Sequence, residues 1–128
     1  IHSWLEFRRV LFRSALVFTI ERQKKLWDTQ QKSAPYIKKY PGIKFFYGDG
    51  FLGLPTYAPF DKVIITAAAP FIPPKLVEQM KVGGRMVIPV NEGEHQRMLR
   101  LTKQQDGTLQ EEKFEQFSFV PMLEGKDQ

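Results

Sequence analysis

Residues 48–90 read GDGFLGLPTYAPFDKVIITAAAPFIPPKLVEQMKVGGRMVIPV, and this stretch decides the fold. Its centre is Val63-Ile64-Ile65, a β-branched apolar run without alternating polar residues. Such a run is typical of a strand buried on both faces, as in a parallel sheet covered by helices. The strand pattern ends in four small residues, Ala67, Ala68, Ala69 and Pro70. Because ligands of open α/β sheets bind outside the carboxyl ends of the strands, we expect these residues to leave room for a ligand.

The residues before this stretch alternate between strand and helix patterns. Residues 15–20 and 43–47 are short apolar runs that predict two buried strands. Residues 21–34 between them are strong helix formers, and Pro35 predicts the end of that helix. A strand, a helix and a second strand in this order are typical of a parallel sheet.

The second half of the stretch predicts one more helix and strand. Pro73 and Pro74 suit the first positions of a helix, where a missing N–H costs nothing. We expect Gly83-Gly84 to end this helix, with one glycine in the left-handed conformation. Residues 85–90 then form a strand, in which Pro89 predicts a bulge or an unpaired side.

The C-terminal part predicts an antiparallel pair of strands over residues 98–103 and 109–122. Asp106-Gly107 between them is a hairpin turn signal. We expect Phe114, Phe117 and Phe119 to lie in the core rather than to form a platform for a nucleobase. The predicted fold class is therefore α/β, with a mostly parallel sheet that is closed by a C-terminal antiparallel hairpin.

Composition narrows the classes of function. At 128 residues the chain has about the length of one domain. It contains no cysteine, so disulfides and thiolate metal sites are excluded and a reducing compartment fits. His2 and His95 are far apart in the sequence and predict no metal site. No apolar run approaches the roughly 18 residues that span a bilayer, so we expect no membrane partner.

The N-terminal segment differs from the rest of the chain. Residues 5–14 read LEFRRVLFRS and resemble the translation of a sequencing-library adapter. We therefore interpret residues 1–14 as a non-native leader and residues 15–128 as the evolved part of a single domain. A basic N-terminal arm is the alternative. Arg8, Arg9 and Arg13 carry much of the net charge of +5, so the remaining charge is too weak to indicate nucleic-acid binding.

Two acidic residues follow predicted strands. Glu21 lies where a dinucleotide-binding sheet places an acid that accepts hydrogen bonds from ribose hydroxyls. It could equally be a first-turn glutamate that complements the helix dipole. Asp49, between Gly48 and Gly50, could accept a hydrogen bond from an adenine amino group, or could belong to a plain Asp-Gly turn.

A glycine pattern at residues 48–53 does not predict a dinucleotide site. Residues 48–53 satisfy G-x-G-x-x-G, but the fingerprint requires a helix directly after it. Pro55 and Pro59 exclude a long helix there, so no phosphate cradle is predicted. The sequence also lacks the nucleophile motif G-x-S-x-G and the zinc motif H-E-x-x-H.

Four segments together resemble one family. These are VFTIERQKKL, FFYGDGFLGLP, APFDKVIITAAAPFIPPKLVEQMKVGGRMVIPV and FSFVPM, and they resemble the protein-L-isoaspartate O-methyltransferases over residues 15–128. The resemblance implies a class I (Rossmann-like) methyltransferase fold and S-adenosyl-L-methionine as methyl donor. It also implies transfer to the carboxylate of L-isoaspartyl or D-aspartyl residues in damaged proteins, as protein repair.

The same resemblance assigns roles to residues. Glu21 corresponds to the residue that binds the donor's ribose, and Asp49 and Gly50 to those at the adenine. The residues near the methyl group and the substrate would be Ala67, Ala68, Ala69, Pro70, Val120 and Pro121. No catalytic base is assigned, because a carboxylate with a pKa near 4 is already ionised at neutral pH.

The chain departs from the family at its N-terminal side. The glycine-rich first motif and the substrate loop of the family are not present, and in the family's strand order 3-2-1-4-5-7-6 the missing first strand is central. We therefore expect a truncated C-terminal portion that binds the donor weakly or not at all and does not turn over. We expect a cytoplasmic monomer without nucleic-acid partners. The alternatives are a class I methyltransferase with another substrate and a non-catalytic, basic nucleic-acid-binding α/β domain.

Overall fold

The computed structural model describes residues 16–32, 39 and 41–127. Within them the chain divides into two compact units, one of residues 16–50 and 124–127 and the other of residues 51–123. Both units contain strands and helices, which confirms the α/β class. The assignment of residues 1–14 as a leader falls outside the described residues, and the single domain over residues 15–128 stays a prediction.

The first unit is a parallel pair of strands joined by a helix. Strands β1 (Val17–Glu21) and β2 (Ile43–Tyr47) pair in parallel, and α2 (Lys24–Lys32) follows β1. The indole Nε1 of Trp27 in α2 donates a hydrogen bond of 3.2 Å to the Phe45 carbonyl, and this bond ties the helix to β2. The two predicted strands are confirmed. The helix predicted over residues 21–34 is confirmed from Lys24 to Lys32, whereas Glu21 belongs to β1.

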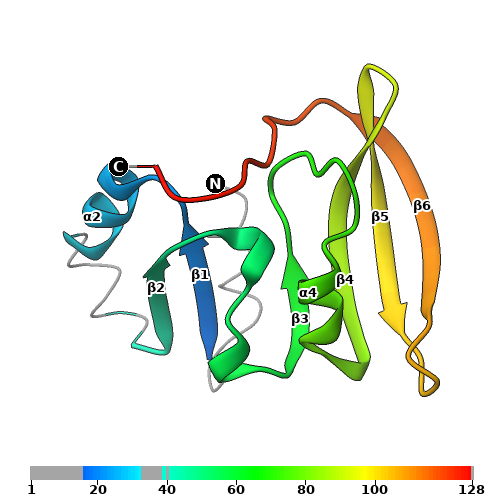
Figure 1. The fold of residues 1–128 in the computed structure, drawn as a ribbon, viewed down its shortest axis with the longest axis horizontal. Helices are drawn as coiled ribbons and strands as arrows, with labels where there is room; N and C mark the ends of the chain where they lie inside the picture. Colours follow the sequence, from blue (N-terminus) through cyan, green and yellow to red (C-terminus); the bar gives the residue numbers. More distant parts are fainter. Residues whose placement is uncertain (1–15, 33–38, 40, 128) are drawn as a thin grey trace. The chain divides into compact units, whose positions relative to one another are not determined.

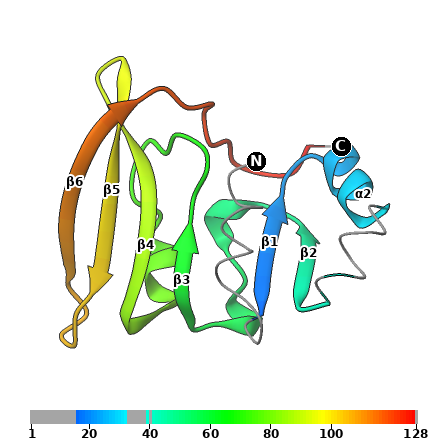
Figure 2. The ribbon, with the colours of Figure 1, turned by 180° about the vertical axis from the view of Figure 1, so that it is seen from behind.

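The second unit is a four-stranded sheet whose strands lie in chain order. Its strands are β3 (Phe60–Ile64), β4 (Met80–Glu92), β5 (His95–Lys103) and β6 (Leu109–Phe117). Strands β3 and β4 are parallel, whereas β4–β5 and β5–β6 are antiparallel. Figure 1 and Figure 2 show these four strands side by side, with α4 (Pro74–Glu78) against β3 and β4. Two short 3-10 turns, η1 (Gly50–Leu52) and η2 (Pro55–Tyr57), precede β3.

This strand order corrects the order that the family resemblance implied, which places the last strand between the two before it. The reason lies in two tight turns. Glu92 pairs with His95 around Gly93, whose φ is 64°. Gly107 has a φ of 86°, and the Gln104 N–H donates to the Thr108 carbonyl across the predicted Asp106-Gly107 turn. Because both connections are short hairpins, consecutive strands must pair with each other.

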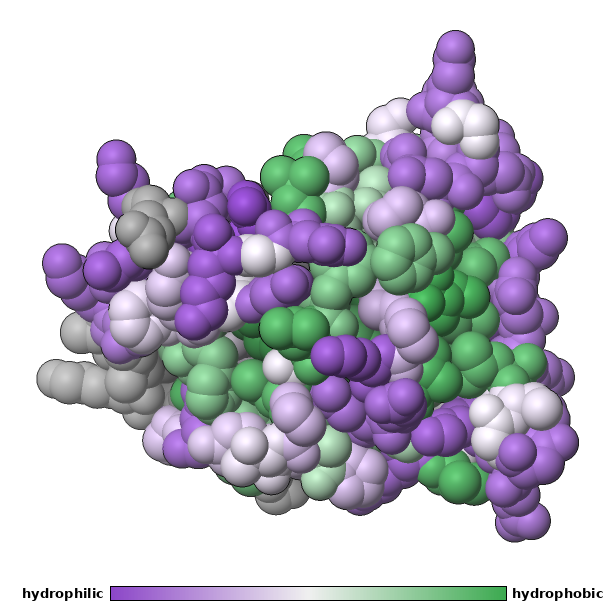
Figure 3. Space-filling model, viewed as in Figure 1, coloured by the Kyte–Doolittle hydropathy of each residue, from purple (hydrophilic) through white to green (hydrophobic). Residues whose placement is uncertain are grey.

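The core of the second unit lies between α4 and the sheet. Met86, Ile88 and Leu101 are completely buried, and Leu76 of α4 packs against them. The same cluster contains further buried residues, namely Ile65, Ala69, Met80 and Leu99. In the space-filling view, apolar residues gather over β4 and β5 (Figure 3). Burial of these side chains is the main stabilising contribution to this unit.

The prediction that Gly83-Gly84 ends the second helix is wrong. Helix α4 ends at Glu78, and both glycines lie inside β4. Gly83 takes the left-handed conformation with φ 84° within the strand. A Cβ on Gly84 would lie 2.8 Å from the Lys81 carbonyl oxygen and 3.1 Å from that of Asp61. The glycines therefore permit an irregular start of β4 close to β3, where the register also shifts.

Pro89 lies in the middle of β4 without a bulge at that point. It pairs with Met98 of β5, and the β4–β5 register runs through it unshifted. Its carbonyl accepts a hydrogen bond of 2.7 Å from the Ala69 N–H. Since the nitrogen and carbonyl of a strand residue point to the same side, the missing N–H faces the segment of Ala69 rather than β5. Of the two alternatives predicted for Pro89, the structure shows a side of the strand without a donated N–H and not a bulge.

The expectation that Phe114 and Phe117 lie in the core is also wrong. Each is 45% exposed, whereas Phe119 is half-buried. Strand β6 is an edge strand, and its register against β5 shifts between Arg97 and Leu99. The Arg100 guanidinium carbon lies 5.5 Å from the centre of the Phe114 ring. Phe114 therefore covers an ion-pairing side chain at the edge of the sheet.

Two ion pairs on the antiparallel strands predict a loss of stability in acid. Arg97 hydrogen-bonds Glu92 at 2.8 Å and Arg100 hydrogen-bonds Glu112 at 2.6 Å, and each arginine lowers the pKa of its glutamate below the ordinary 4.5. A lowered pKa contributes stability above the ordinary pKa that is lost as the pH falls through the folded-state pKa. We expect urea unfolding to show decreasing stability below pH 4.5. Glu112→Gln should reduce this dependence, whereas Glu111→Gln at an exposed neighbouring position should leave it unchanged. An equal dependence in both variants would contradict the assignment.

Candidate functional site

Two of the predicted cofactor-binding residues lie together at the carboxyl ends of β1 and β2. Glu21 is the last residue of β1 and pairs with Tyr47, the last residue of β2. The Gly48 N–H donates a hydrogen bond of 2.9 Å to the Glu21 carbonyl, so Asp49 follows directly beside the end of β1. Both acids are half-buried. The structure therefore brings these two carboxylates to one edge of the parallel pair, where α/β sheets bind ligands.

The carboxylate of Glu21 is oriented by its own chain. Its Oε2 accepts a hydrogen bond of 3.2 Å from the Gln23 N–H, just before α2 begins at Lys24. Asp49 Oδ2 accepts a hydrogen bond of 3.0 Å from the Gly125 N–H. Gly50 begins η1 and does not have a positive φ. Asp49-Gly50 therefore does not form a turn with a left-handed glycine. Their roles in binding ribose and adenine stay predictions.

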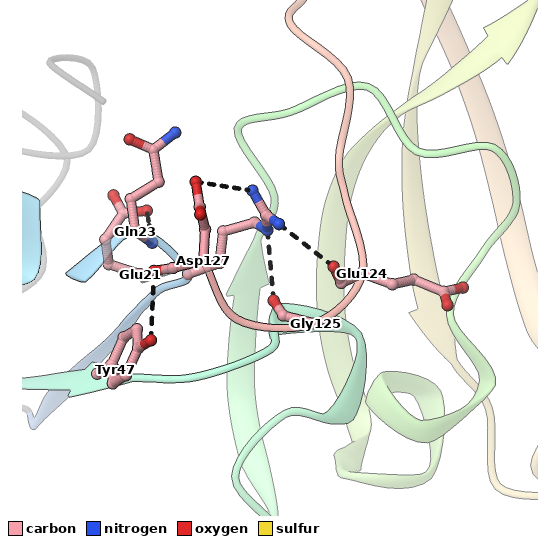
Figure 4. A network of polar contacts seen from close by, with 7 residues as sticks. Glu21, Gln23, Tyr47, Glu124, Gly125 and Asp127 are labelled. Carbon is pink, nitrogen blue, oxygen red and sulfur yellow. Dashed lines mark hydrogen bonds and ion pairs between the residues drawn. The ribbon is translucent and has the colours of Figure 1, made fainter.

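A network that the sequence did not indicate lies beside these acids. Residues 124–127 run along the end of β1, and Figure 4 shows their contacts with the residues after Glu21 and with Tyr47. The Asp127 N–H donates to the Arg22 carbonyl at 2.7 Å, and the Lys24 N–H donates to the Asp127 carbonyl at 3.1 Å. The Tyr47 hydroxyl donates to the same carbonyl at 3.2 Å. These contacts are mostly to main-chain atoms, which carry no sequence signal.

The predicted substrate-proximal residues come together in the second unit. The Ala68 N–H donates to the Val120 carbonyl at 2.6 Å, and the Met122 N–H donates to the Ala68 carbonyl at 2.7 Å. Ala68 thus forms a parallel bridge with Pro121. On the next residue, Ala69 donates to Pro89 and accepts from Asn91 at 2.9 Å. Segments distant in sequence therefore meet at the end of β3.

Burial corrects the expectation that all the alanines leave room. Ala68 is 3% exposed and Ala69 is completely buried, because main chains pack closely on both. Ala67 is half-buried, and the exposed members of the group are Pro70, Val120 and Pro121. A substrate could therefore contact the exposed members and Ala67, while Ala68 and Ala69 hold the segment in place. Their role toward a substrate stays a prediction.

Gln79 is a second residue whose role the sequence did not reveal. It is buried after the end of α4, and its Nε2 donates to the Leu52 carbonyl at 3.0 Å. Its Oε1 accepts from the Leu54 N–H at 2.9 Å. Gly53 between them has φ 63°. The amide therefore fixes the loop that follows Gly50 in the sequence.

Other features of the described residues do not indicate a different chemistry. An open hollow of about 440 Å³ is lined by Arg97, Phe114, Glu115 and Phe117, and contains none of the predicted site residues. Within the part of the chain that the structure describes, no cluster of three His, Cys, Asp or Glu residues could hold a metal ion. Among the same residues, no helix has the length and apolar character needed to cross a membrane.

Solved structures share this fold. A crystal structure from Plasmodium falciparum, described as a protein-L-isoaspartate O-methyltransferase in complex with S-adenosyl-L-homocysteine, matches with a TM-score of 0.70. It is 21% identical, and the match covers 84% of this chain and 52% of that chain. A second protein-L-isoaspartate O-methyltransferase matches with a TM-score of 0.76 at 23% identity, over 88% of this chain and 36% of that one. Both show the methyltransferase fold of this chain.

Sequence relatives agree with the structural match. The protein-L-isoaspartate O-methyltransferase of Flavobacterium johnsoniae is 44% identical over 119 residues, which are 92% of this chain and 55% of that protein. The protein-L-isoaspartate O-methyltransferase of Cytophaga hutchinsonii is 45% identical over 113 residues, which are 87% of this chain and 49% of that protein. The chain thus spans about half the length of these curated relatives. The family model described as Protein-L-isoaspartate(D-aspartate) O-methyltransferase (PCMT) matches residues 6–127, and the chain belongs to this family.

Proposed function

We propose that the protein containing these residues transfers a methyl group from S-adenosyl-L-methionine to the carboxylate of L-isoaspartyl or D-aspartyl residues in damaged proteins. Family membership supports the reaction class. The observation in this chain that carries the proposal is the pair of half-buried carboxylates, Glu21 and Asp49, at the ends of neighbouring parallel strands. Such a pair suits the adenosine half of the donor.

The chemistry of the donor fits these two residues. A ribose presents hydroxyl donors and adenine presents an amino donor, while an ionised carboxylate only accepts hydrogen bonds. Glu21 would accept from the ribose hydroxyls, and Asp49 with the backbone of Gly50 would hold the adenine. The bound donor would supply a methyl group on a positively charged sulfur.

The reaction requires positioning rather than a catalytic base. An isoaspartyl carboxylate is ionised at neutral pH, so no proton has to be removed. Methyl transfer then depends on alignment of the reacting atoms and on exclusion of water. Ala67, Pro70, Val120 and Pro121 would form the wall that receives the peptide. The main-chain groups of Ala68 and Ala69 hold that wall, since both are already hydrogen-bonded to neighbouring segments.

Donor binding tests the proposed acids. We expect Asp49→Asn and Glu21→Gln each to weaken binding of S-adenosyl-L-homocysteine by about tenfold to a hundredfold, as expected for loss of a hydrogen bond to a charged group. Isothermal titration of the 128-residue chain at high protein concentration measures this. Asp61→Asn is the matched control, because Asp61 is an exposed acid that pairs with Lys81 at 3.1 Å in the second unit. Equal affinities in all three variants would contradict the assignment of the acids.

Activity separates the substrate alternatives. Of the two expected outcomes for the 128-residue chain, weak donor binding or none, the carboxylates of Glu21 and Asp49 favour weak binding. We expect no turnover, and measured methylation of an isoaspartyl peptide by this chain would contradict that expectation. The full-length relative from Flavobacterium johnsoniae should methylate an isoaspartyl peptide and not the normal aspartyl peptide. Equal activity on both peptides would favour a class I methyltransferase with a different substrate.

The proposed setting is the cytoplasm, with a monomeric protein and without nucleic-acid or membrane partners. The absence of cysteine supports a reducing compartment. A salt-dependent affinity for RNA or DNA would instead favour the nucleic-acid-binding alternative. Two carboxylates at the strand ends count against that alternative, because they repel phosphates.

A further inference from the structure

We propose that residues 124–127 form a reversible strap that competes with the methyl donor for Asp49. This inference rests on the proposed donor site at Glu21 and Asp49. The strap's Gly125 N–H donates to Asp49 Oδ2 at 3.0 Å, on the carboxylate assigned to the adenine. A ligand amino group and the Gly125 N–H are both hydrogen-bond donors, so they compete for the same acceptor.

The strap lies on the edge of β1 that β2 does not occupy. The Glu21 carbonyl accepts from Gly48 on the side of β2. Successive carbonyls of an extended chain point to opposite sides, so the carbonyl of Arg22 points away from β2. That carbonyl accepts from the Asp127 N–H at 2.7 Å, and Gln23 forms a parallel bridge with Asp127. The strap thus adds a short strand-like segment directly beyond Glu21.

Side chains hold the strap by long and exposed contacts. Arg22 Nε donates to the Gly125 carbonyl at 3.3 Å, and its Nη1 lies 4.0 Å from the Asp127 carboxylate. Lys126 Nζ lies 5.0 Å from the centre of the Tyr47 ring. Each exposed contact of this kind contributes little to the stability of the closed strap. The strap can therefore open locally without unfolding β1 and β2.

The position of the strap gives a quantitative expectation. If the site binds the donor only when the strap is open, the apparent affinity falls by the fraction of open molecules. A strap that is closed in most molecules then weakens binding by about threefold to tenfold. Removing the strap should therefore raise the apparent affinity for the donor by that factor. By the same linkage, a bound ligand should favour the open strap.

The experiment compares S-adenosyl-L-homocysteine binding by calorimetry in the 128-residue chain and three variants. Two variants open the strap: deletion of residues 124–128, and Gly125→Pro, which removes the donated N–H and cannot adopt φ 77°. Both should bind about threefold to tenfold more tightly than the unmodified chain. Glu124→Gln is the control, because Glu124 contributes only its carbonyl, which accepts from Arg22 at 3.5 Å. Circular dichroism confirms that each variant is folded.

Amide hydrogen exchange supplies a readout that does not depend on activity. The Gly125 and Asp127 amides should be protected in the free chain and lose protection when S-adenosyl-L-homocysteine saturates it. If the chain binds S-adenosyl-L-homocysteine equally well, or more weakly, after deletion of residues 124–128, the strap is overturned. Either result would leave the proposed function standing. Unprotected Gly125 and Asp127 amides in the free chain would also overturn the strap. No binding by any variant would overturn the donor site at Glu21 and Asp49 in this chain, and the strap with it.

Discussion

Leu101→Ala should lower the free energy of unfolding of the second unit by about 2–5 kcal/mol. Leu101 is completely buried in β5, where it pairs with Met86 of β4. It belongs to the core cluster that also contains Ile88 and Leu99. Truncation removes the transfer free energy of the lost atoms and leaves a cavity, because the neighbouring strands are hydrogen-bonded in fixed register.

Amide exchange of β4 and β5 measures this loss, since the most protected amides of a unit exchange through its complete unfolding. Fluorescence of Trp27 would report the other unit, where that side chain lies. Val82→Ala is the matched control, because Val82 is an apolar residue of β4 that is 56% exposed. It should change stability by no more than about 0.5 kcal/mol. A loss no larger for Leu101→Ala than for Val82→Ala would show that Leu101 does not lie in the core.

Gly53→Ala should destabilise the second unit by about 2–4 kcal/mol, the sum of two effects. Gly53 has φ 63°, a conformation that costs an alanine about 1–2 kcal/mol. A Cβ there would meet the Gln79 Oε1 and lie 2.7 Å from Leu76 Cδ2. Gln79 could move only by breaking its bonds to Leu52 and Leu54, which would leave buried polar groups without partners.

Gly107→Ala separates the two effects. Gly107 has φ 86°, but no atom lies within 4 Å of the position of its Cβ, so only the backbone cost remains. We expect it to cost about 1 kcal/mol, measured by the same amide exchange. In addition, the double variant Gly53→Ala, Gln79→Ala should lose less stability than the sum of the two single variants. The reason is that Gln79→Ala removes the side-chain oxygen with which the new Cβ at position 53 would clash. Equal costs for Gly53→Ala and Gly107→Ala would contradict the role of Gln79.

Local patterns predicted most of the elements in this chain. Residues 43–47 contain Ile43 and three aromatic residues, and they form β2 with the predicted bounds. Asp106-Gly107 is a turn whose chemistry is contained in two residues, and it forms the predicted hairpin. Glu21 was placed correctly at a strand end for the same reason. Each of these features is decided by neighbours in the sequence.

Features that depend on distant contacts were not predicted correctly. Gly83-Gly84 has the signature of a helix end, but both lie inside β4, where the carbonyls of Phe60 and Asp61 in β3 leave no room for a Cβ on Gly84. Phe114 and Phe117 have the pattern of a core strand, but only the strand order shows that β6 is an edge. The contacts of residues 124–127 use main-chain groups, which are the same in every sequence. Tertiary context therefore decided what local propensity could not.

The chain-order arrangement of β4, β5 and β6 has a consequence for the route of folding. Both of its turns are short, so these strands can pair through contacts between near neighbours, which form early because little loop entropy is lost. The bridge between Ala68 and Pro121 closes a much longer loop and should form after them. The wall proposed to receive the peptide would then be completed only after the two hairpins have formed.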